Sequence, residues 1–255
     1  MKKFISFSGG VESTTMCVLF GNNADAIFAD TGFEHKEIYD RIDLVENWCK
    51  SFHRSDFKIH KVKNEKYGTL PDYIRSSHYY PNFMSRYCTR MFKIEPIDNF
   101  LKQYESKGVE IMIGLNADEI DKRTGAHGLL AFIKYSYPLA DNGINREGCI
   151  VVLKKTGLYP NFPPYMKRGG CKGCYYKSDK EFEAMAALDP DEFAEVQLLE
   201  ENLNQYLSTR GKFFSIRPTK TMKMIKEQAL TSLFKPDEVY ATINDATQCG
   251  VFCNR

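Results

Sequence analysis

Two adjacent glycines close to the amino terminus constrain the fold of this chain more than any other feature. Residues 4–7 form a short apolar run, Gly9 and Gly10 follow it, and residues 11–20 then carry apolar side chains at roughly helical spacing. This pattern predicts a strand, a tight turn and a helix. Consecutive glycines let a ligand approach the backbone closely, and the first turn of a helix offers unpaired N–H groups at the positive end of its dipole. The turn therefore suits a phosphate group.

The spacing of the glycines excludes two common phosphate-binding loops. A P-loop requires Lys and then Ser or Thr directly after its last glycine, and a dinucleotide fingerprint requires three spaced glycines. Gly9 and Gly10 provide neither pattern. For so short a motif, an ordinary strand-to-helix turn without a ligand is the alternative interpretation.

The composition is that of a soluble globular protein. With 255 residues, of which 43% are hydrophobic and 27% charged, the chain can bury the core of one large domain, and its net charge of +2 neither requires nor excludes nucleic acid. The first apolar run is too short for a signal peptide, and no stretch approaches the ~20 apolar residues of a membrane span. We therefore expect a cytoplasmic protein without a membrane partner. In that compartment the eight cysteines serve as thiols or metal ligands rather than as disulfides.

Apolar strands and amphipathic helices alternate along the first 140 residues. Further strands are predicted at residues 25–30, 58–62 and 110–114. Helices are predicted at residues 38–52, after Thr69 and at 93–101. The alternation predicts an α/β fold with a doubly wound, mostly parallel sheet that has helices on both faces. In such sheets ligands bind beyond the carboxyl ends of the strands, where residues 8–13 and 30–39 are expected to lie.

The chain changes character after residue 140. Residues 149–153 are interpreted as an outer strand, and helices are predicted after Asp189 and at residues 219–230. We therefore divide the chain into a first domain, residues 1–140, and a carboxyl-terminal helical region with a Cys-x-x-Cys pair and a cysteine-containing tail, residues 141–255.

Residues 8–13, Ser-Gly-Gly-Val-Glu-Ser, resemble the Ser-Gly-Gly-x-Asp-Ser loop of the PP-loop ATP pyrophosphatase superfamily, which includes the sulfonucleotide reductases. Glu12 stands where that superfamily usually has Asp. The resemblance implies that residues 1–140 have an adenine nucleotide alpha hydrolase-like fold, in which the loop holds the distal phosphates of ATP together with Mg²⁺. The residues that it assigns to this role are Ser8, Gly9, Gly10, Glu12 and Ser13.

A second segment, Asp30-Thr31-Gly32 with Glu37 at a fixed distance, is similar to the segment that follows the second strand in phosphoadenosine phosphosulfate (PAPS) reductases. The resemblance implies that these four residues contact the same adenine nucleotide. A Thr-Gly turn followed by acidic residues at a solvated helix start is the alternative interpretation.

After the strand predicted at residues 110–114, Asp118, Glu119 and Arg123 stand where the family places Asp-Glu and a later Arg. The resemblance implies that Asp118 binds a metal or the substrate and that Arg123 clamps a phosphate, for which a planar guanidinium is well suited. Alternatively, Glu119 and Arg123 form an i,i+4 charge pair on a solvated loop.

Three thiols in the body of the chain fall in metal-ligand patterns. Cys88, with Lys93 and Pro96 behind it, is similar to the Cys-Cys-x-x-x-Lys-x-x-Pro segment of iron–sulfur sulfonucleotide reductases, although Thr89 replaces the second cysteine. By this resemblance Lys93 also contacts the nucleotide. Cys171 and Cys174 form a Cys-x-x-Cys turn with glycine inside, which places two thiolates in the half-site geometry of zinc or iron–sulfur centres.

The tail holds Cys249 and Cys253. Cys249-Gly250-Val251 resembles the Glu-Cys-Gly-Leu-His tail of the sulfonucleotide reductases, whose cysteine attacks the sulfonucleotide, but Gln248 and Phe252 replace Glu and His. The resemblance makes Cys249 a candidate nucleophile and Cys253 an added thiol. A four-thiolate site then comprises Cys88, Cys171, Cys174 and one of the two tail cysteines. The fourth ligand is Cys253 if Cys249 is the nucleophile. Such a site holds a [4Fe-4S] cluster or alternatively Zn²⁺.

The resemblance implies an enzyme that binds ATP, adenylates an acceptor with release of pyrophosphate, and takes part in sulfur transfer. The alternative enzyme is a PAPS or APS reductase that uses Cys249 as its nucleophile. An alternative of another class is a non-catalytic, metal-clamped module that binds nucleotide or nucleic acid. The sequence does not identify the acceptor, and nucleic acid is one candidate for it. A sulfur donor protein and a second copy of the chain are the other partners considered.

Overall fold

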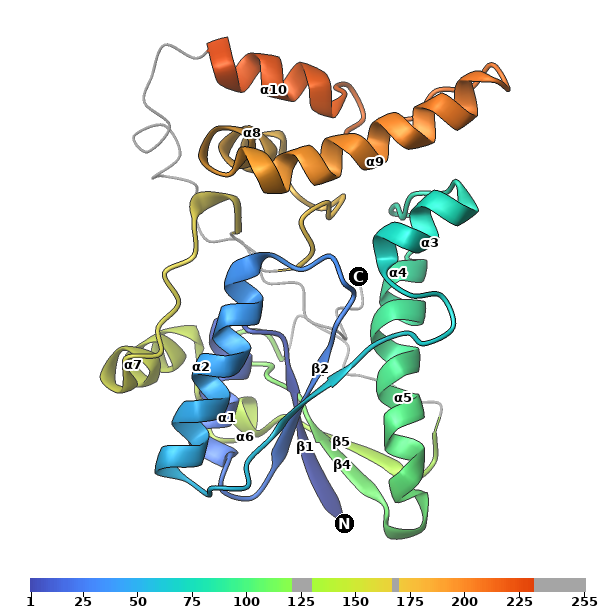
Figure 1. The fold of residues 1–255 in the computed structure, drawn as a ribbon. Coiled ribbons are helices and arrows are strands. Elements are labelled where there is room, and N and C mark those ends of the chain that lie inside the picture. The colour runs from blue at the N-terminus through green and yellow to red at the C-terminus, as the bar shows by residue number, and fades with distance from the viewer. Residues whose placement is uncertain (121–129, 167–169, 232–255) are drawn as a thin grey trace.

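The computed structural model describes residues 1–120, 130–166 and 170–231, and these form a sheet with helices on both faces (Figure 1). The five strands are all parallel and lie in the order β3-β2-β1-β4-β5. Their bounds are β1 (Lys2–Phe7), β2 (Asp25–Ala29), β3 (Ile59–Val62), β4 (Val109–Met112) and β5 (Ile133–Ser136). The strand order reverses between β1 and β4, so the carboxyl ends of these two strands form the topological switch point at which such sheets bind ligands. The predicted α/β fold is confirmed.

The central strand β1 is buried on both sides because its residues alternate between two hydrophobic clusters. Phe4 belongs to one cluster, together with Ile111 of β4. Ile5 and Phe7 belong to the other, together with Phe28 of β2. A strand covered on both faces needs apolar residues at every position, which explains the continuous apolar run in the sequence.

The two clusters separate two groups of helices. One face of the sheet carries α1 (Val11–Phe20), α2 (Lys36–Phe52) and α7 (Arg146–Thr156), and the other carries α5 (Glu95–Leu101) (Figure 1). Beyond the carboxyl ends of the strands lie α3 (Leu70–Ser77), α8 (Asp179–Leu188), α9 (Pro190–Ser208) and α10 (Met222–Thr231) (Figure 1). Short turns of helix complete the described chain: α4 (Tyr87–Thr89), a π-helix (Arg90–Ile94), α6 (Pro138–Asp141), and 3-10 helices at Lys102–Lys107 and Pro164–Met166. None of the described helices has the length and apolar character that a membrane crossing requires.

The outer strand expected at residues 149–153 is wrong, because these residues lie in α7. The Asn145 side chain accepts a hydrogen bond from the Gly148 amide at the start of this helix, and Gly157 ends it with a φ of 70°. Cys149 and Leu153 are buried one helical turn apart against the core. The apolar, β-branched run suggests a strand by propensity, but the cap and the burial at i,i+4 spacing favour a helix.

The hydrophobic core continues past residue 140. One cluster includes Ile5 of β1, Leu153 of α7, Phe193 of α9 and Ile225 of α10. The carboxyl-terminal helices therefore share one continuous hydrophobic cluster with the helices α1, α2 and α7. The division of the chain at residue 140 stays a prediction.

Candidate functional site

The glycine turn lies at the switch point, between the end of β1 and the start of α1. Gly9 has a φ of 77°, in the left-handed region that favours glycine, and a Cβ at this position would come within 3.1 Å of Ile38 Cδ1. Gly10 precedes α1, whose first turn has no side-chain cap. The structure thus has the backbone geometry that the sequence predicted for a phosphate-binding turn.

Ser8 and Ser13 meet across this turn. The Ser8 amide donates to Ser13 Oγ at 3.2 Å, and the two hydroxyl oxygens also lie 3.2 Å apart. Ser13 Oγ in turn donates to the Gly10 carbonyl at 3.3 Å. The structure therefore brings together Ser8, Gly9, Gly10 and Ser13, four of the five loop residues that the sequence assigned to phosphate binding.

Glu12, the fifth, is 5% exposed in the first turn of α1. Its Oε1 accepts hydrogen bonds from Arg146 Nη1 at 2.6 Å and Asn116 Nδ2 at 3.3 Å. Its Oε2 is buried and has no hydrogen-bond partner among the described residues. Sequence reasoning missed Asn116 and Arg146; the only signal was that Asn116 comes directly after the strand that ends at the switch point.

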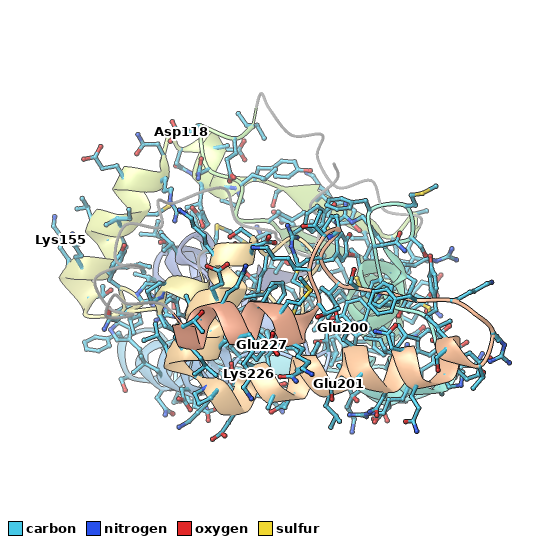
Figure 2. All side chains as sticks on the ribbon, turned by 90° about the horizontal axis from the view of Figure 1, so that it is seen from above. Asp118, Lys155, Glu200, Glu201, Lys226 and Glu227 are labelled. Atoms are coloured by element: carbon cyan, nitrogen blue, oxygen red, sulfur yellow. The ribbon has the colours of Figure 1, made fainter. Side chains whose placement is uncertain are left out.

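Asp118 lies apart from this carboxylate. It is exposed, and its Oδ2 accepts from the Arg146 amide at 3.4 Å. Figure 2 shows Asp118 at the periphery, on the side of the molecule that carries Lys155 of α7. Asp118 is thus linked to Glu12 through Arg146 and through Asn116, whose Oδ1 accepts from the Asp118 amide at 3.0 Å. Arg123, the other residue predicted from this segment, lies outside the described residues.

The segment after β2 forms a second tight turn. Asp30 Oδ1 accepts from the Gly32 amide at 2.8 Å and from the Tyr39 hydroxyl at 2.7 Å. Gly32 has a φ of 67°, and a Cβ there would lie 2.4 Å from Thr69 Cγ2, so no larger residue fits. A cavity of about 640 Å³ opens beside Asp30, between the end of β3 and α5. This volume is in the range of small-molecule sites.

The Cys-x-x-Cys turn packs on the segment after β2. Cys171 Sγ lies 3.6 Å from Thr31 Oγ1 and 3.6 Å from Glu34 Oε1, and Glu34 pairs with Cys171 through an isolated antiparallel bridge. The Lys172 amide donates to the Phe33 carbonyl at 2.9 Å. Residues of the two segments that are 137 positions apart in the chain therefore share one surface.

Cys88 and Lys93 approach the same turn from the other side. Burial raises the pKa of Cys88, Cys171 and Cys174, and the proximity of Cys174 raises that of Cys88 further, whereas the Lys93 ammonium lowers the pKa of all three thiols. Lys93 Nζ also lies 3.8 Å from Glu34 Oε1. The structure thus gathers three of the four predicted metal ligands around Lys93. The fourth, Cys253, and the predicted nucleophile, Cys249, lie outside the described residues.

The three thiols are spaced more widely than the ligands of a single zinc ion. Within the described ranges, the three sulfur atoms do not all lie within 4.8 Å of one another. Tetrahedral Zn–S bonds of about 2.3 Å place thiolates ~3.8 Å apart, whereas a multi-iron cluster spreads its ligands further. Cys88, Cys171 and Cys174 would hold three of its irons.

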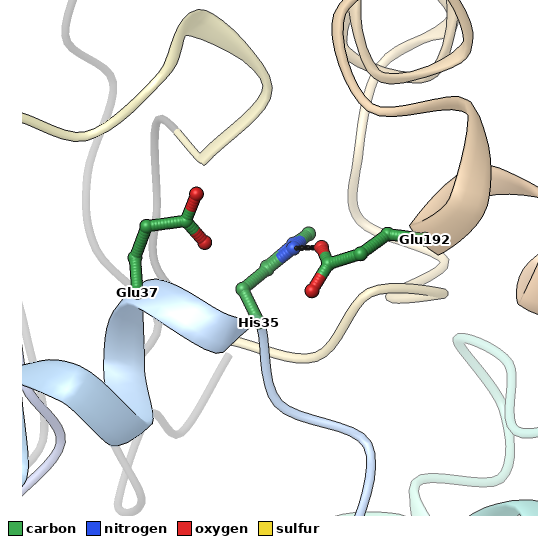
Figure 3. Close-up of side chains that lie close together, drawn as sticks. All are labelled: His35, Glu37 and Glu192. Atoms are coloured by element: carbon green, nitrogen blue, oxygen red, sulfur yellow. Dashed lines mark hydrogen bonds and ion pairs between the residues drawn. The ribbon is translucent and has the colours of Figure 1, made fainter.

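His35, Glu37 and Glu192 form a compact group between α2 and α9, with ligand atoms within 4.8 Å of one another (Figure 3). Sequence reasoning did not find it. Glu192 Oε2 contacts His35 Nδ1, and Glu192 Oε1 accepts from the Lys36 amide at 3.0 Å and lies 3.6 Å from Lys172 Nζ. Both carboxylate oxygens of Glu192 therefore contact nitrogen atoms of the protein. The group clamps α9 onto the start of α2, and it leaves His35 Nε2 and Glu37 Oε2 buried without a hydrogen-bond partner among the described residues.

Burial lowers the pKa of His35 in this clamp, although the hydrogen bond to Glu192 acts in the opposite direction. Glu37, which the sequence assigned to the nucleotide site, reaches the Tyr165 hydroxyl at 3.5 Å with Oε1, and its buried Oε2 has no hydrogen-bond partner among the described residues. Glu37 thus belongs to the clamp and directly precedes Ile38, the residue of α2 that faces Gly9.

The parallel sheet with a glycine turn at its switch point defines a doubly wound α/β domain of the nucleotide-binding class. Residues 2–127 match the family model described as the phosphoadenosine phosphosulfate reductase domain. Residues 2–127 thus carry a domain of the PAPS reductase family, which supports a function related to sulfonucleotides.

Two known proteins are similar to parts of the chain. An uncharacterized protein of Methanocaldococcus jannaschii is 30% identical over 103 residues, which are 39% of this chain and 23% of that protein. The match thus spans less than a quarter of the relative's length. The crystal structure of a PAPS reductase from Candida auris, a phosphate complex, is similar with a TM-score of 0.46 and 12% identity over 63% of this chain and 74% of that chain.

Proposed function

We propose that the protein is an enzyme that binds ATP with Mg²⁺ over the glycine turn, adenylates an acceptor and releases pyrophosphate. The buried carboxylate of Glu12 carries this proposal. Arg146 holds one of its oxygens, and the other has no hydrogen-bond partner in the part of the chain that the structure describes. A buried carboxylate oxygen without a donor costs free energy. Mg²⁺ prefers carboxylate and phosphate oxygens as ligands, so Glu12 fits this ion at the mouth of a phosphate-binding turn.

The chain's own groups would orient the triphosphate. The N–H groups at the start of α1 and the hydroxyls of Ser8 and Ser13 would bind its β and γ phosphates. The acceptor then forms a bond to the α-phosphorus, and the bond from that phosphorus to pyrophosphate breaks with its electron pair on the leaving oxygen. Mg²⁺ held by Glu12 would neutralise the negative charge on the leaving pyrophosphate.

The thiols beside Thr31 support a role in sulfur transfer. Cys88, Cys171 and Cys174 lie around Lys93, on the surface that also carries the segment after β2. We propose that they hold a [4Fe-4S] cluster, with Cys253 as the fourth ligand. A cluster at this position would be adjacent to the nucleotide, where an activated acceptor is formed.

The second candidate is a PAPS or APS reductase, and the match of residues 2–127 to the reductase domain favours it. In that reaction Cys249 would attack the sulfur atom of the sulfonucleotide, and the bond between sulfur and the phosphate oxygen would break. A thiol donor would then reduce the resulting thiosulfonate and release sulfite. This reaction has no leaving pyrophosphate and gives Glu12 no Mg²⁺ to bind.

One experiment separates the candidates. Purified protein is incubated with ATP, Mg²⁺ and a mixture of cellular small RNAs and metabolites as acceptors, or with PAPS and a dithiol, and pyrophosphate and sulfite are measured. We expect pyrophosphate that depends on added acceptor and disappears in Glu12→Gln. Sulfite from PAPS without any ATP turnover would contradict adenylation and establish the reductase.

A further inference from the structure

We propose that Arg41 positions the glycine turn and supplies the positive charge against which the phosphoryl end of the nucleotide binds. Residues 8–13 contain no lysine or arginine, so the turn itself offers only dipoles. Arg41 lies on α2 directly behind the turn and is 7% exposed. This inference rests on the proposed nucleotide site and adds a residue to it.

A single guanidinium holds three segments of the chain. Arg41 Nε donates to the Gly9 carbonyl at 2.8 Å. Its Nη2 donates to Thr14 Oγ1 at 3.0 Å and to the Leu158 carbonyl at 2.9 Å. The planar fork thus fixes the turn after β1, the first turns of α1 and the chain that leaves α7 in one arrangement.

The hydrogen bond to Gly9 also sets the direction of the next amide. The peptide between Gly9 and Gly10 is trans, as are all peptides in the described chain. In a planar trans peptide the N–H points opposite to the C=O. Because the Gly9 carbonyl points toward Arg41, the Gly10 N–H points in the opposite direction, away from Arg41. An amide held in this direction is ready to donate to a phosphate oxygen.

The charge of Arg41 has no carboxylate counter-ion among the described residues, since its hydrogen-bond acceptors are two carbonyls and a hydroxyl. Glu37, one turn earlier on α2, bonds to the Tyr165 hydroxyl instead. Burial lowers the pKa of Arg41 to about 10, so the guanidinium is still charged at neutral pH. A buried and unpaired charge is costly, and an anion bound on the other side of the turn offsets that cost.

Arg54 provides a matched control. Like Arg41 it donates to a glycine carbonyl, that of Gly21 at 3.2 Å, but it is paired with the carboxylate of Asp25 and lies just beyond the carboxyl end of α2. If arginine side chains in this fold only satisfy backbone carbonyls, both residues should affect stability alone. If Arg41 also serves the phosphates, only its loss should change nucleotide affinity.

The test measures the affinities of ATP·Mg²⁺ and of AMP by titration calorimetry for the wild type, Arg41→Met, Arg41→Lys and Arg54→Met. We expect Arg41→Met to weaken ATP binding about tenfold, which corresponds to ~1.4 kcal/mol, and to leave AMP binding nearly unchanged. Arg41→Lys should be intermediate because it keeps the charge but not the fork. Arg54→Met should lower the melting temperature and change neither affinity.

Two results would overturn the inference while the proposed site stands: wild-type ATP affinity in Arg41→Met, or an equal loss for ATP and AMP, which indicates general damage to the fold. If Arg41→Met does not fold, Thr14→Val takes its place, since it removes one of the two acceptors of Nη2 and keeps the shape of the side chain. We then expect ATP binding to be weaker by about threefold, the effect of ~0.6 kcal/mol, with AMP unchanged. A wild-type protein that binds neither ligand would contradict the proposed function, and this inference with it.

Discussion

The hydroxyl of Thr31 lies 3.6 Å from the sulfur of Cys171. Thr31 follows β2 in a segment that the sequence assigned to the nucleotide, and Cys171 belongs to the turn that it assigned to a metal centre. Glu34 joins them, because its Oε1 accepts from Thr31 at 2.9 Å and lies 3.6 Å from the same sulfur. The segment predicted to bind the nucleotide and the turn predicted to bind a metal therefore lie in contact.

The first prediction concerns this thiol group. Cys171→Ser and Cys174→Ser should each lose most of the bound metal, because serine is a poor ligand for iron and the remaining thiols cannot complete the site. The measurement is iron, sulfide and zinc content, with the visible absorbance after anaerobic purification. Cys49→Ser is the control, since Cys49 is buried on α2 and its thiol contacts the Cys17 carbonyl. Full metal content in both test variants would refute the metal centre.

The second prediction concerns the free oxygen of Glu12. Glu12→Gln should remove most of the Mg²⁺ dependence of ATP binding, about a tenfold effect, because the amide no longer carries the charge that binds the ion. Glu12→Asp should retain the dependence, since it keeps the carboxylate. Calorimetric titrations with ATP in the presence and absence of Mg²⁺ give the comparison. The same Mg²⁺ dependence in wild type and Glu12→Gln would show that this carboxylate binds no ion.

The third prediction uses two glycines with the same backbone conformation. Gly9 and Gly143 have φ values of 77° and 65°, but a Cβ at Gly9 would press on Ile38, whereas one at Gly143 would meet no atom within 4 Å. Alanine at either position should cost about 1 kcal/mol of unfolding free energy through backbone strain, and Gly9→Ala somewhat more. Only Gly9→Ala should weaken ATP binding, as measured by calorimetry. Equal ATP affinities in the two variants would indicate that the turn does not touch the nucleotide.

The fourth prediction concerns stability at low pH. Lys2 Nζ lies 2.8 Å from Asp25 Oδ2, and Arg54 and His60 also face this carboxylate. Burial alone would raise the pKa of Asp25, but hydrogen bonds from His60, Lys2 and Arg54 outweigh it and hold the pKa below its ordinary value. Because the folded-state pKa is depressed, this stabilisation is complete above the unfolded pKa of about 3.9 and is lost as the pH falls through the folded value.

Urea unfolding between pH 7 and pH 3 tests the role of Asp25. Asp25→Asn should lower the free energy of unfolding at pH 7 by about 1–2 kcal/mol and make it less dependent on pH in the acid range. Asp56→Asn is the control, because Asp56 also pairs with Arg54 but its side chain is 81% exposed. If the free energy of unfolding fell equally with pH in wild type and Asp25→Asn through the acid range, Asp25 would not be the source of this pH dependence.

The sequence predicted those parts of the fold that short patterns specify. The strand–turn–helix around Gly9 and the buried strand before Asp30 follow from apolar runs broken by turn residues, and the structure confirms both. The helix α8 was missed although its signal is present: Ser178 and Glu181 form a capping box at its start. For residues 149–153 the propensity of β-branched side chains misled the interpretation, because the cap at Asn145 decides the local structure.

The sequence could not predict the residues that complete the site through tertiary contacts. Arg146 reaches Glu12 across 134 residues of chain, and Arg41 reaches Gly9 across 32. In the helical pattern of α2, Arg41 stands next to the buried Ile42 and reads as part of a solvated face. Only the packing of α2 against the glycine turn shows that its charge is buried, and no local pattern contains that information.

The most direct test of the account is a crystal structure of the protein with ATP and Mg²⁺. The account predicts the triphosphate over residues 8–13, with a phosphate oxygen within hydrogen-bond distance of the Gly10 amide and the ion on Glu12 Oε2. A nucleotide bound elsewhere on the protein, with nothing at this turn, would contradict it.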